Sequence, residues 1–276
     1  MGIAEDILGP GGWQAALEAL SWQVDLGVTE VVGDSPLDAF ALPQEAPAMA
    51  PKSAPAPRPA RVATEPVAPL PAGPDPVEAA RAVARGAPDL ESLREAIAGY
   101  DLCELKRGAR NTVFADGRAG ARVLILGEAP GRDEDLEGRP FVGRAGQLLD
   151  RMFAAIGLSR NSPDLEHALY ITNVLPWRPP QNRDPTPEEI AMMRPFVERH
   201  IELAAPEVVV VMGNTPLAAL LNQRGITRAR GQWSRALDLP VLPMFHPAYL
   251  LRNPHAKREA WADLLALEDR LAGGGS

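Results

Sequence analysis

Short apolar runs alternate with amphipathic stretches along the second half of the chain, and this alternation sets the predicted architecture. Four runs rich in Val, Leu and Ile have the length of buried strands and lie near residues 122–126, 170–175, 207–212 and 240–245. Helical periodicity follows these runs near residues 144–157, 187–204, 214–222 and 256–271. Strands that alternate with helices favour a parallel sheet covered on both faces. The pattern therefore predicts an α/β fold of three layers, α/β/α, around a central, mainly parallel four-stranded sheet.

The beginning of the chain has a different composition. Four large apolar side chains fall on one face of a short predicted helix: Trp13, Leu17, Leu20 and Val24. Such a helix is expected to dock on a partner protein or on this chain itself, or to remain undocked. The next segment has 11 prolines within residues 42–76, which leaves too little apolar surface to order it. The predicted organisation is a helical segment, a disordered Pro/Ala-rich linker and a folded domain, at residues 1–41, 42–76 and 77–272.

Charge is unevenly distributed along the chain, whose formal net charge is -8. Residues 1–100 hold 14 acidic and 6 basic side chains, whereas residues 101–276 hold 22 of each. The neutral part can still gather arginines such as Arg139, Arg178 and Arg252 on one face, where they would attract phosphate. The acidic balance therefore does not exclude nucleic acid as a partner.

The chain has one cysteine, so an intrachain disulfide is excluded. It shows no secretory pattern at its beginning, and no apolar run approaches the length of about 18 residues that a membrane span needs. We expect a monomeric protein with no membrane association in the reducing cytoplasm, associated there with the nucleoid.

Three predicted strands end in motifs that carry chemistry. The first runs into Gly127–Asp135 (GEAPGRDED) and then Gly138–Gly143 (GRPFVG), a loop bent by glycine and proline. The other two run into a proline-rich loop at 178–187 and into the segment 246–252 (HPAYLLR). Parallel sheets bind ligands at the carboxyl ends of their strands. One edge of the sheet should therefore present a Glu, an Asn and a His together.

These motifs, in this order, resemble the uracil-DNA glycosylase superfamily, and in particular its family 4 branch. The matching segments are GEAPGRDED, GRPFVGRAG, ITNVLPWRPPQNRDPTPEE and HPAYLLR, spread over about residues 100–270. The resemblance implies a bacterial-type monofunctional enzyme of base excision repair. Such an enzyme flips uracil out of single- or double-stranded DNA and hydrolyses its N-glycosidic bond, leaving an abasic site.

The resemblance also assigns the uracil-binding residues. Asn173 would match the base edge, accepting from N3–H and donating to O4, and Phe141 would stack on the flipped ring. Ala129 occupies the position where many superfamily members carry an aspartate. Glu134 would crowd C5 and so refuse the methyl group of thymine. From the residues alone, Asn173 could equally cap a turn and Phe141 could belong to the core.

The remaining assignments concern catalysis and DNA contact. His246 would stabilise the negative charge that develops at O2 of the departing uracil, and Glu128 and Asn182 are candidates for activating water. The segment after the histidine resembles the superfamily loop that enters the minor groove, with Tyr249, Leu250, Leu251 and Arg252. The alternative for its two leucines is the first turn of a helix that faces the core.

Family 4 enzymes usually carry a [4Fe–4S] cluster on four cysteines, and here this chain departs from the pattern. The matching positions are Tyr100, Cys103, Trp177 and Met193. One thiolate cannot hold a cubane cluster. We therefore predict no cluster, no metal and no other cofactor, with the three large side chains filling the vacated volume.

Other functions remain open at this stage. The same fold could remove hypoxanthine or xanthine, or it could capture uracil-DNA without turnover or through a covalent bond to histidine. A covalent binder of this superfamily carries a Lys/Arg-rich insertion between the segments that hold Asn173 and Met193, which is not present here. A regulator that binds nucleotides through GEAPG is the weakest alternative, because the chain has neither a Walker lysine nor GxGxxG.

Overall fold

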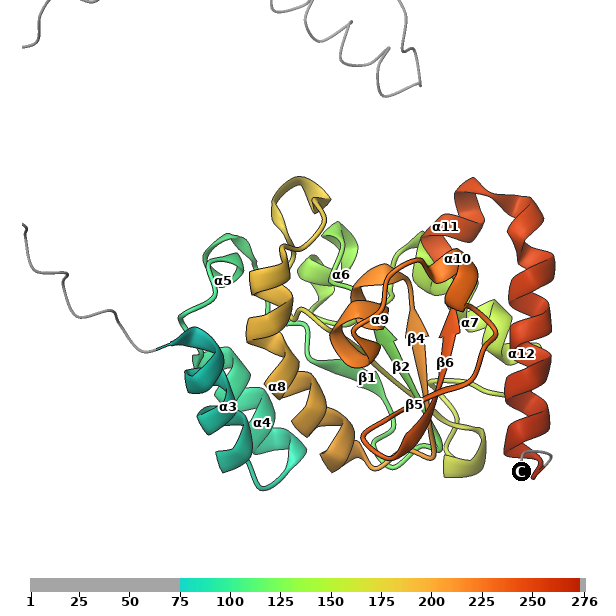
Figure 1. The fold of residues 1–276 in the computed structure, drawn as a ribbon, viewed down its shortest axis with the longest axis horizontal. Coiled ribbons are helices and arrows are strands. Elements are labelled where there is room, and N and C mark those ends of the chain that lie inside the picture. The colour runs from blue at the N-terminus through green and yellow to red at the C-terminus, as the bar shows by residue number, and fades with distance from the viewer. Residues whose placement is uncertain (1–74, 274–276) are drawn as a thin grey trace, which may run out of the picture. The chain divides into compact units, whose positions relative to one another are not determined.

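The structure, a computed structural model, describes residues 75–273 and places a sheet between two layers of helices (Figure 1). The predicted helix at 1–41 and nearly all of the predicted linker at 42–76 lie outside the described residues. On one side of the sheet stand α3 (Pro76–Gly86), α4 (Leu90–Gly99), α8 (Pro187–Ala204) and α9 (Asn214–Leu221). The other side is covered by α7 (Arg144–Ala154) and α12 (Lys257–Leu271). The three-layer α/β/α prediction is confirmed.

The described sheet has six strands rather than the four predicted. Its order is β1-β3-β2-β4-β6-β5. The four predicted strands form the parallel centre: β2 (Val123–Gly127), β3 (Leu169–Asn173), β4 (Val208–Met212) and β6 (Leu239–Met244). Two edge strands of three residues each, β1 (Ala115–Gly117) and β5 (Ser234–Ala236), pair antiparallel to β3 and β6. Their sequences, ADG and SRA, are too short and too polar to produce a strand pattern.

Short helices fill the connections between the larger elements. They are α5 (Leu105–Gly108), α6 (Arg132–Glu137), α10 (Ile226–Ala229), α11 (Pro247–Arg252), and the 3-10 turns η1 (Leu165–His167), η2 (Pro180–Asn182) and η3 (Pro254–Ala256). None of the helices within residues 75–273 is long and apolar enough to cross a membrane.

Alternation along the central strands divides the core into two halves. Leu124 and Leu126 of β2 pack in the cluster beneath α3, α4, α8 and α9, whereas Val123 and Ile125 pack in the cluster beneath α7 and α12. Side chains of a strand point alternately to opposite faces, so a strand that is apolar at every position must be covered on both sides. This explains why β2 and β4 read as unbroken apolar runs.

The longest helix, α8, begins where its sequence predicts. The Thr186 hydroxyl accepts from the Glu189 amide, and the Glu189 carboxylate accepts from the Thr186 amide, at 3.2 and 2.8 Å. This reciprocal pair is a capping box, and Pro187 occupies the first helical position, where its missing N–H costs nothing. The cap also ends the proline-rich loop at a fixed point beside the sheet edge.

Candidate active site

The candidate site lies where the order of the parallel strands reverses direction. The chain passes from β2 outward to β3, then returns to β4 on the other side of β2 and continues to β6. Because these four strands are parallel, their carboxyl ends share one edge. Glu128 follows β2, Asn173 ends β3 and His246 follows β6. Ligands of open α/β sheets bind in the crevice at this kind of reversal.

One hydrogen bond connects the loop after β2 to the helix after β4, the two strands at which the order reverses. The Thr215 hydroxyl, in the first turn of α9 after β4, donates to Glu128 Oε2 at 2.6 Å. Burial raises the pKa of Glu128, and Asp184 raises it further, while the Thr215 hydrogen bond acts in the opposite direction. Thr215 is itself buried and was not among the predicted site residues. Its position just after a fourth strand end was the signal that could have identified it.

Asn173 and Phe141 meet at Gly127. A Cβ at this glycine would lie 2.3 Å from Asn173 Oδ1 and 2.5 Å from Phe141 Cε2, so only glycine leaves room for both side chains. Asn173 is 7% exposed, and its Oδ1 is buried without a hydrogen-bond partner among the residues that the structure describes. Leaving a buried polar group unpaired costs roughly 1–3 kcal/mol. An orphaned acceptor at a sheet edge therefore points to a ligand that donates to it.

His246 is fixed as a neutral imidazole beside the same aromatic ring. Its Nδ1 accepts from the Ala248 amide at 3.1 Å at the start of α11, so the ring proton belongs on Nε2. Burial lowers the pKa of His246 to about 4, and the nearby Arg252 lowers it as well. The His246 and Phe141 ring centroids are 5.4 Å apart. The Nε2–H group is therefore a hydrogen-bond donor that carries no charge at neutral pH.

Glu134 is held in the loop through both of its carboxylate oxygens. Its Oε1 accepts from the Val142 and Gly143 amides at 3.0 and 2.9 Å, and its Oε2 accepts from the Gly131 amide at 3.1 Å. These bonds engage both carboxylate oxygens in bracing the two halves of the loop. That Glu134 also crowds a bound base stays a prediction. Ala129, in the same loop, is partly buried and packs against the core.

Within residues 75–273, Asn182 makes no hydrogen bond to the residues gathered at the sheet edge. It is exposed at the end of η2, and its Oδ1 accepts from Arg178 Nε at 2.8 Å. Among the described residues no hydrogen bond joins it to Glu128, Asn173 or His246. The geometry therefore favours Glu128 over Asn182 as the group that handles water.

The predicted DNA-contacting segment divides into exposed and buried positions. Leu250 is fully buried on α11 in a small cluster with Leu148 and Phe245. The prediction that it contacts DNA is corrected, because the helix turns this side chain into the core. Tyr249 and Leu251 are partly buried, and Arg252 is exposed. These three remain on the accessible side of the segment.

The four positions that correspond to cluster ligands form part of the core. Tyr100, Cys103, Trp177 and Met193 are between 1% and 5% exposed and belong to one apolar cluster. Tyr100 donates its hydroxyl to the Pro76 carbonyl at 2.6 Å, and Trp177 Nε1 donates to Thr112 Oγ1 at 3.1 Å. Burial raises the pKa of the single thiol, Cys103, which disfavours the thiolate. These residues do not fit a [4Fe–4S] cluster, and residues 75–273 contain no group of three or more His, Cys, Asp or Glu placed to hold a metal ion.

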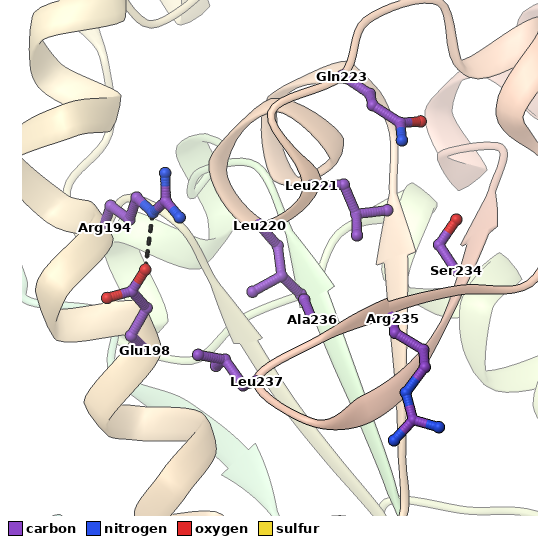
Figure 2. A pocket seen from close by; sticks show the side chains of 9 residues that line it. All are labelled: Arg194, Glu198, Leu220, Leu221, Gln223, Ser234, Arg235, Ala236 and Leu237. Atoms are coloured by element: carbon purple, nitrogen blue, oxygen red, sulfur yellow. Dashed lines mark hydrogen bonds and ion pairs between the residues drawn. The ribbon is translucent and has the colours of Figure 1, made fainter.

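A hollow of about 470 Å³ lies elsewhere on the domain (Figure 2). It is lined by side chains of α8, the end of α9, and β5 with its following turn, and an ion pair between Arg194 and Glu198 borders it. None of the predicted site residues lines it.

The residues at the sheet edge have a definite chemical capability. An amide presents an acceptor to an N–H group, an aromatic face lies beside it, and a neutral imidazole offers a donor. This combination suits a flat heterocycle that carries an amide-like edge and that gains negative charge as it leaves.

Comparison with known proteins agrees with this geometry. Residues 114–265 match the family model described as the uracil DNA glycosylase superfamily. The chain is 37% identical over 185 residues to a type-4 uracil-DNA glycosylase of Archaeoglobus fulgidus, covering 63% of this chain and 89% of the relative. It is 39% identical over 169 residues to one from Thermotoga maritima, covering 59% and 84%. A type-5 uracil-DNA glycosylase of Pyrobaculum aerophilum is 30% identical over 149 residues, covering 50% and 66%. The chain belongs to the uracil DNA glycosylase superfamily.

Proposed function

We propose that this protein is a monofunctional uracil-DNA glycosylase that acts in base excision repair without a metal or cluster. Its substrate is uracil in single- or double-stranded DNA, and its products are free uracil and an abasic site. The single observation that carries the proposal is the unpaired, buried Oδ1 of Asn173 at the carboxyl edge of the sheet. The similarity to type-4 uracil-DNA glycosylases supports it independently.

Recognition of uracil is proposed to depend on Asn173 and Phe141. The N3–H group of a flipped uracil would donate to the unpaired Oδ1, and the amide NH₂ would donate to O4. Cytosine presents a lone pair at N3 and an amine at position 4, so both contacts would be mismatched. Each buried mismatch costs roughly 1–3 kcal/mol. Stacking on Phe141 would hold the base plane in place.

Bond cleavage is proposed to depend on His246 and Glu128. As the N-glycosidic bond breaks, positive charge develops on the sugar and negative charge on uracil, mainly at O2. The Nε2–H of neutral His246 would donate to O2 and stabilise the anion. Glu128, held at one oxygen by Thr215, would use its other oxygen to orient the water that attacks the sugar. The exposed side of Tyr249–Arg252 would contact the DNA around the flipped nucleotide.

Two alternatives follow from the same pocket. A glycosylase for hypoxanthine or xanthine would need the pocket to accept a purine, and a binder without turnover would need uracil to be held but not released. No separate geometric feature favours either. Both are distinguished from the leading proposal by the experiment below.

The test is incubation of the purified protein with oligonucleotides that carry one uracil, hypoxanthine, xanthine, thymine or cytosine. Strand breaks that appear only after alkali, and only with uracil, are the expected result. The matched control is Asn173→Asp, which cannot donate to O4 and should show little excision. Breaks without alkali, breaks at hypoxanthine or xanthine, or a retained complex without release of uracil would each contradict the proposal.

A further inference from the structure

We propose that Arg160 is a positioning residue that sets the Phe141 ring for the base, an inference that rests on the proposed function. Arg160 lies after α7, outside every motif that the sequence singles out. Its side chain is 6% exposed, although an arginine is among the residues least often buried. A buried cation that belongs to no known part of the site calls for a physical role.

The guanidinium connects three elements through four hydrogen bonds. Its two terminal nitrogens donate to the carbonyls of Pro140 and Phe141, both at 2.9 Å. The same side chain donates to Asp116 of β1 at 2.9 Å and to Asp150 of α7 at 2.8 Å. The two carboxylates compensate the buried charge, and the planar fork is directed at consecutive carbonyls of one loop. Lysine has a single nitrogen and cannot reproduce this geometry.

The loop needs such a clamp because Phe141 has an unfavourable backbone conformation. Its φ is +53°, in the left-handed region that residues with a side chain adopt at a cost. An unfavourable backbone conformation persists only where the surrounding structure stabilises it, and such conformations are frequent at functional sites. In this conformation the Phe141 ring contacts Gly127 and lies 5.4 Å from His246. Holding the backbone at this residue therefore holds the ring against the candidate pocket.

Two further contacts complete the clamp. A Cβ at Gly146 would lie 1.7 Å from the Phe141 carbonyl oxygen, so the first turn of α7 presses directly on that peptide group. On the other side of the loop, Glu134 accepts from the Val142 and Gly143 amides. Arg160 thus fixes two carbonyls and Glu134 fixes the next two amides. The four consecutive residues of the loop are held from both sides.

A double-mutant cycle tests whether Arg160 acts through Phe141. The four proteins are the unchanged chain, Arg160→Lys, Phe141→Ala and the double variant, and single-turnover excision of uracil is measured for each. We expect Arg160→Lys to lower the rate about 10-fold to 100-fold, as misplacement of a reacting group by about 1 Å does. In the Phe141→Ala background the same change should cost less than about threefold, because coupled residues are not additive. Arg151→Lys is the matched control: it makes the same substitution at an exposed arginine of α7, so it should leave the rate within about threefold of the unchanged chain.

A second readout does not depend on activity. Chymotrypsin cleaves after aromatic residues, so release of the loop should speed cleavage between Phe141 and Val142 in Arg160→Lys by about 10-fold, and not in Arg151→Lys. Equal rate losses in both backgrounds of the cycle would overturn the inference. So would unchanged proteolysis, or an Arg160→Lys protein that does not fold, since the residue would then serve the fold as a whole. If the unchanged chain excises no uracil while Arg160→Lys is still cleaved faster than it, the proposed function is rejected and the clamp remains supported.

Discussion

Asn173→Ala should separate stability from activity, because the native asparagine is unsatisfied in the free protein. The residue is 7% exposed, and its Oδ1 lacks a partner in the described part of the chain. Truncation removes the unpaired oxygen together with the amide that would read the base. The change therefore relieves a cost in the folded state and removes a contact that forms only with substrate.

The magnitudes follow from that geometry. Removing an unpaired buried carbonyl raises the free energy of unfolding by roughly 1–3 kcal/mol. Lost packing lowers it by about 1 kcal/mol, the usual effect of a point mutation. The net change should be between about 0 and +2 kcal/mol, and each kcal/mol shifts the melting temperature of a domain this size by about 2–4 °C. Loss of two hydrogen bonds to the base, at roughly 1–3 kcal/mol each, should lower excision between about 30-fold and 10⁴-fold.

Thermal unfolding and single-turnover excision of a uracil oligonucleotide, measured on the same preparations, provide the assay. Asn161→Ala is the matched control, because that asparagine is exposed and should change neither quantity. A melting temperature lowered by more than about 4 °C would mean that Asn173 has a structural partner in the folded protein. An excision loss below about tenfold would mean that its amide does not read the base. Either result would refute the reasoning.

Three other outcomes are expected. In an NMR titration His246 should lose its proton near its pKa of about 4, and the proton of the neutral ring should be on Nε2. Because this pKa is below the value of about 6.5 in an unfolded chain, His246 should lower the free energy of unfolding as pH falls from about 6.5 towards 4. Titration of His246 near 6.5 would contradict the assigned environment. Glu128→Gln should lower the excision rate by about 10²-fold or more, whereas Asn182→Ala should change it less than about threefold. A larger rate loss in Asn182→Ala than in Glu128→Gln would assign water activation to Asn182. The purified protein should be colourless and keep its activity after chelation and after Cys103→Ser; absorbance near about 400 nm with stoichiometric iron would show that a cluster forms.

Features of the fold that arise from local pattern could be predicted from the sequence. The helix at Pro187–Ala204 matches its predicted bounds because its capping box and its proline are encoded in consecutive residues. The four central strands were visible because most of their residues are buried and apolar. Edge strands β1 and β5 were not, since three-residue polar segments acquire strand geometry only from the neighbour they pair with.

The candidate site likewise has parts that the local sequence predicts and parts that depend on residues distant in the chain. Glu128, Asn173 and His246 could be placed on one edge, because parallel strands bring their carboxyl ends together regardless of detail. The supporting contacts could not be predicted, because Thr215, Arg160 and the carboxylate of Glu134 act through partners distant in the chain. Leu250 shows that a motif can also mislead: the segment resembles a DNA-contacting loop, but helix α11 turns this leucine into the core.

Contacts around the four positions that correspond to cluster ligands hold the neighbouring segments together. A four-cysteine cluster would join the segment before the sheet, the loop after β3 and helix α8. Here the Val113 amide donates to the Pro176 carbonyl at 2.8 Å, and Trp177 bonds to Thr112, which joins the first two segments. Tyr100 meets Phe196 of α8 edge to face at 5.2 Å, which joins the first to the third. Hydrogen bonds and aromatic packing thus connect the same three elements that such a cluster would join, and they anchor the loop that begins at the end of β3 next to Asn173.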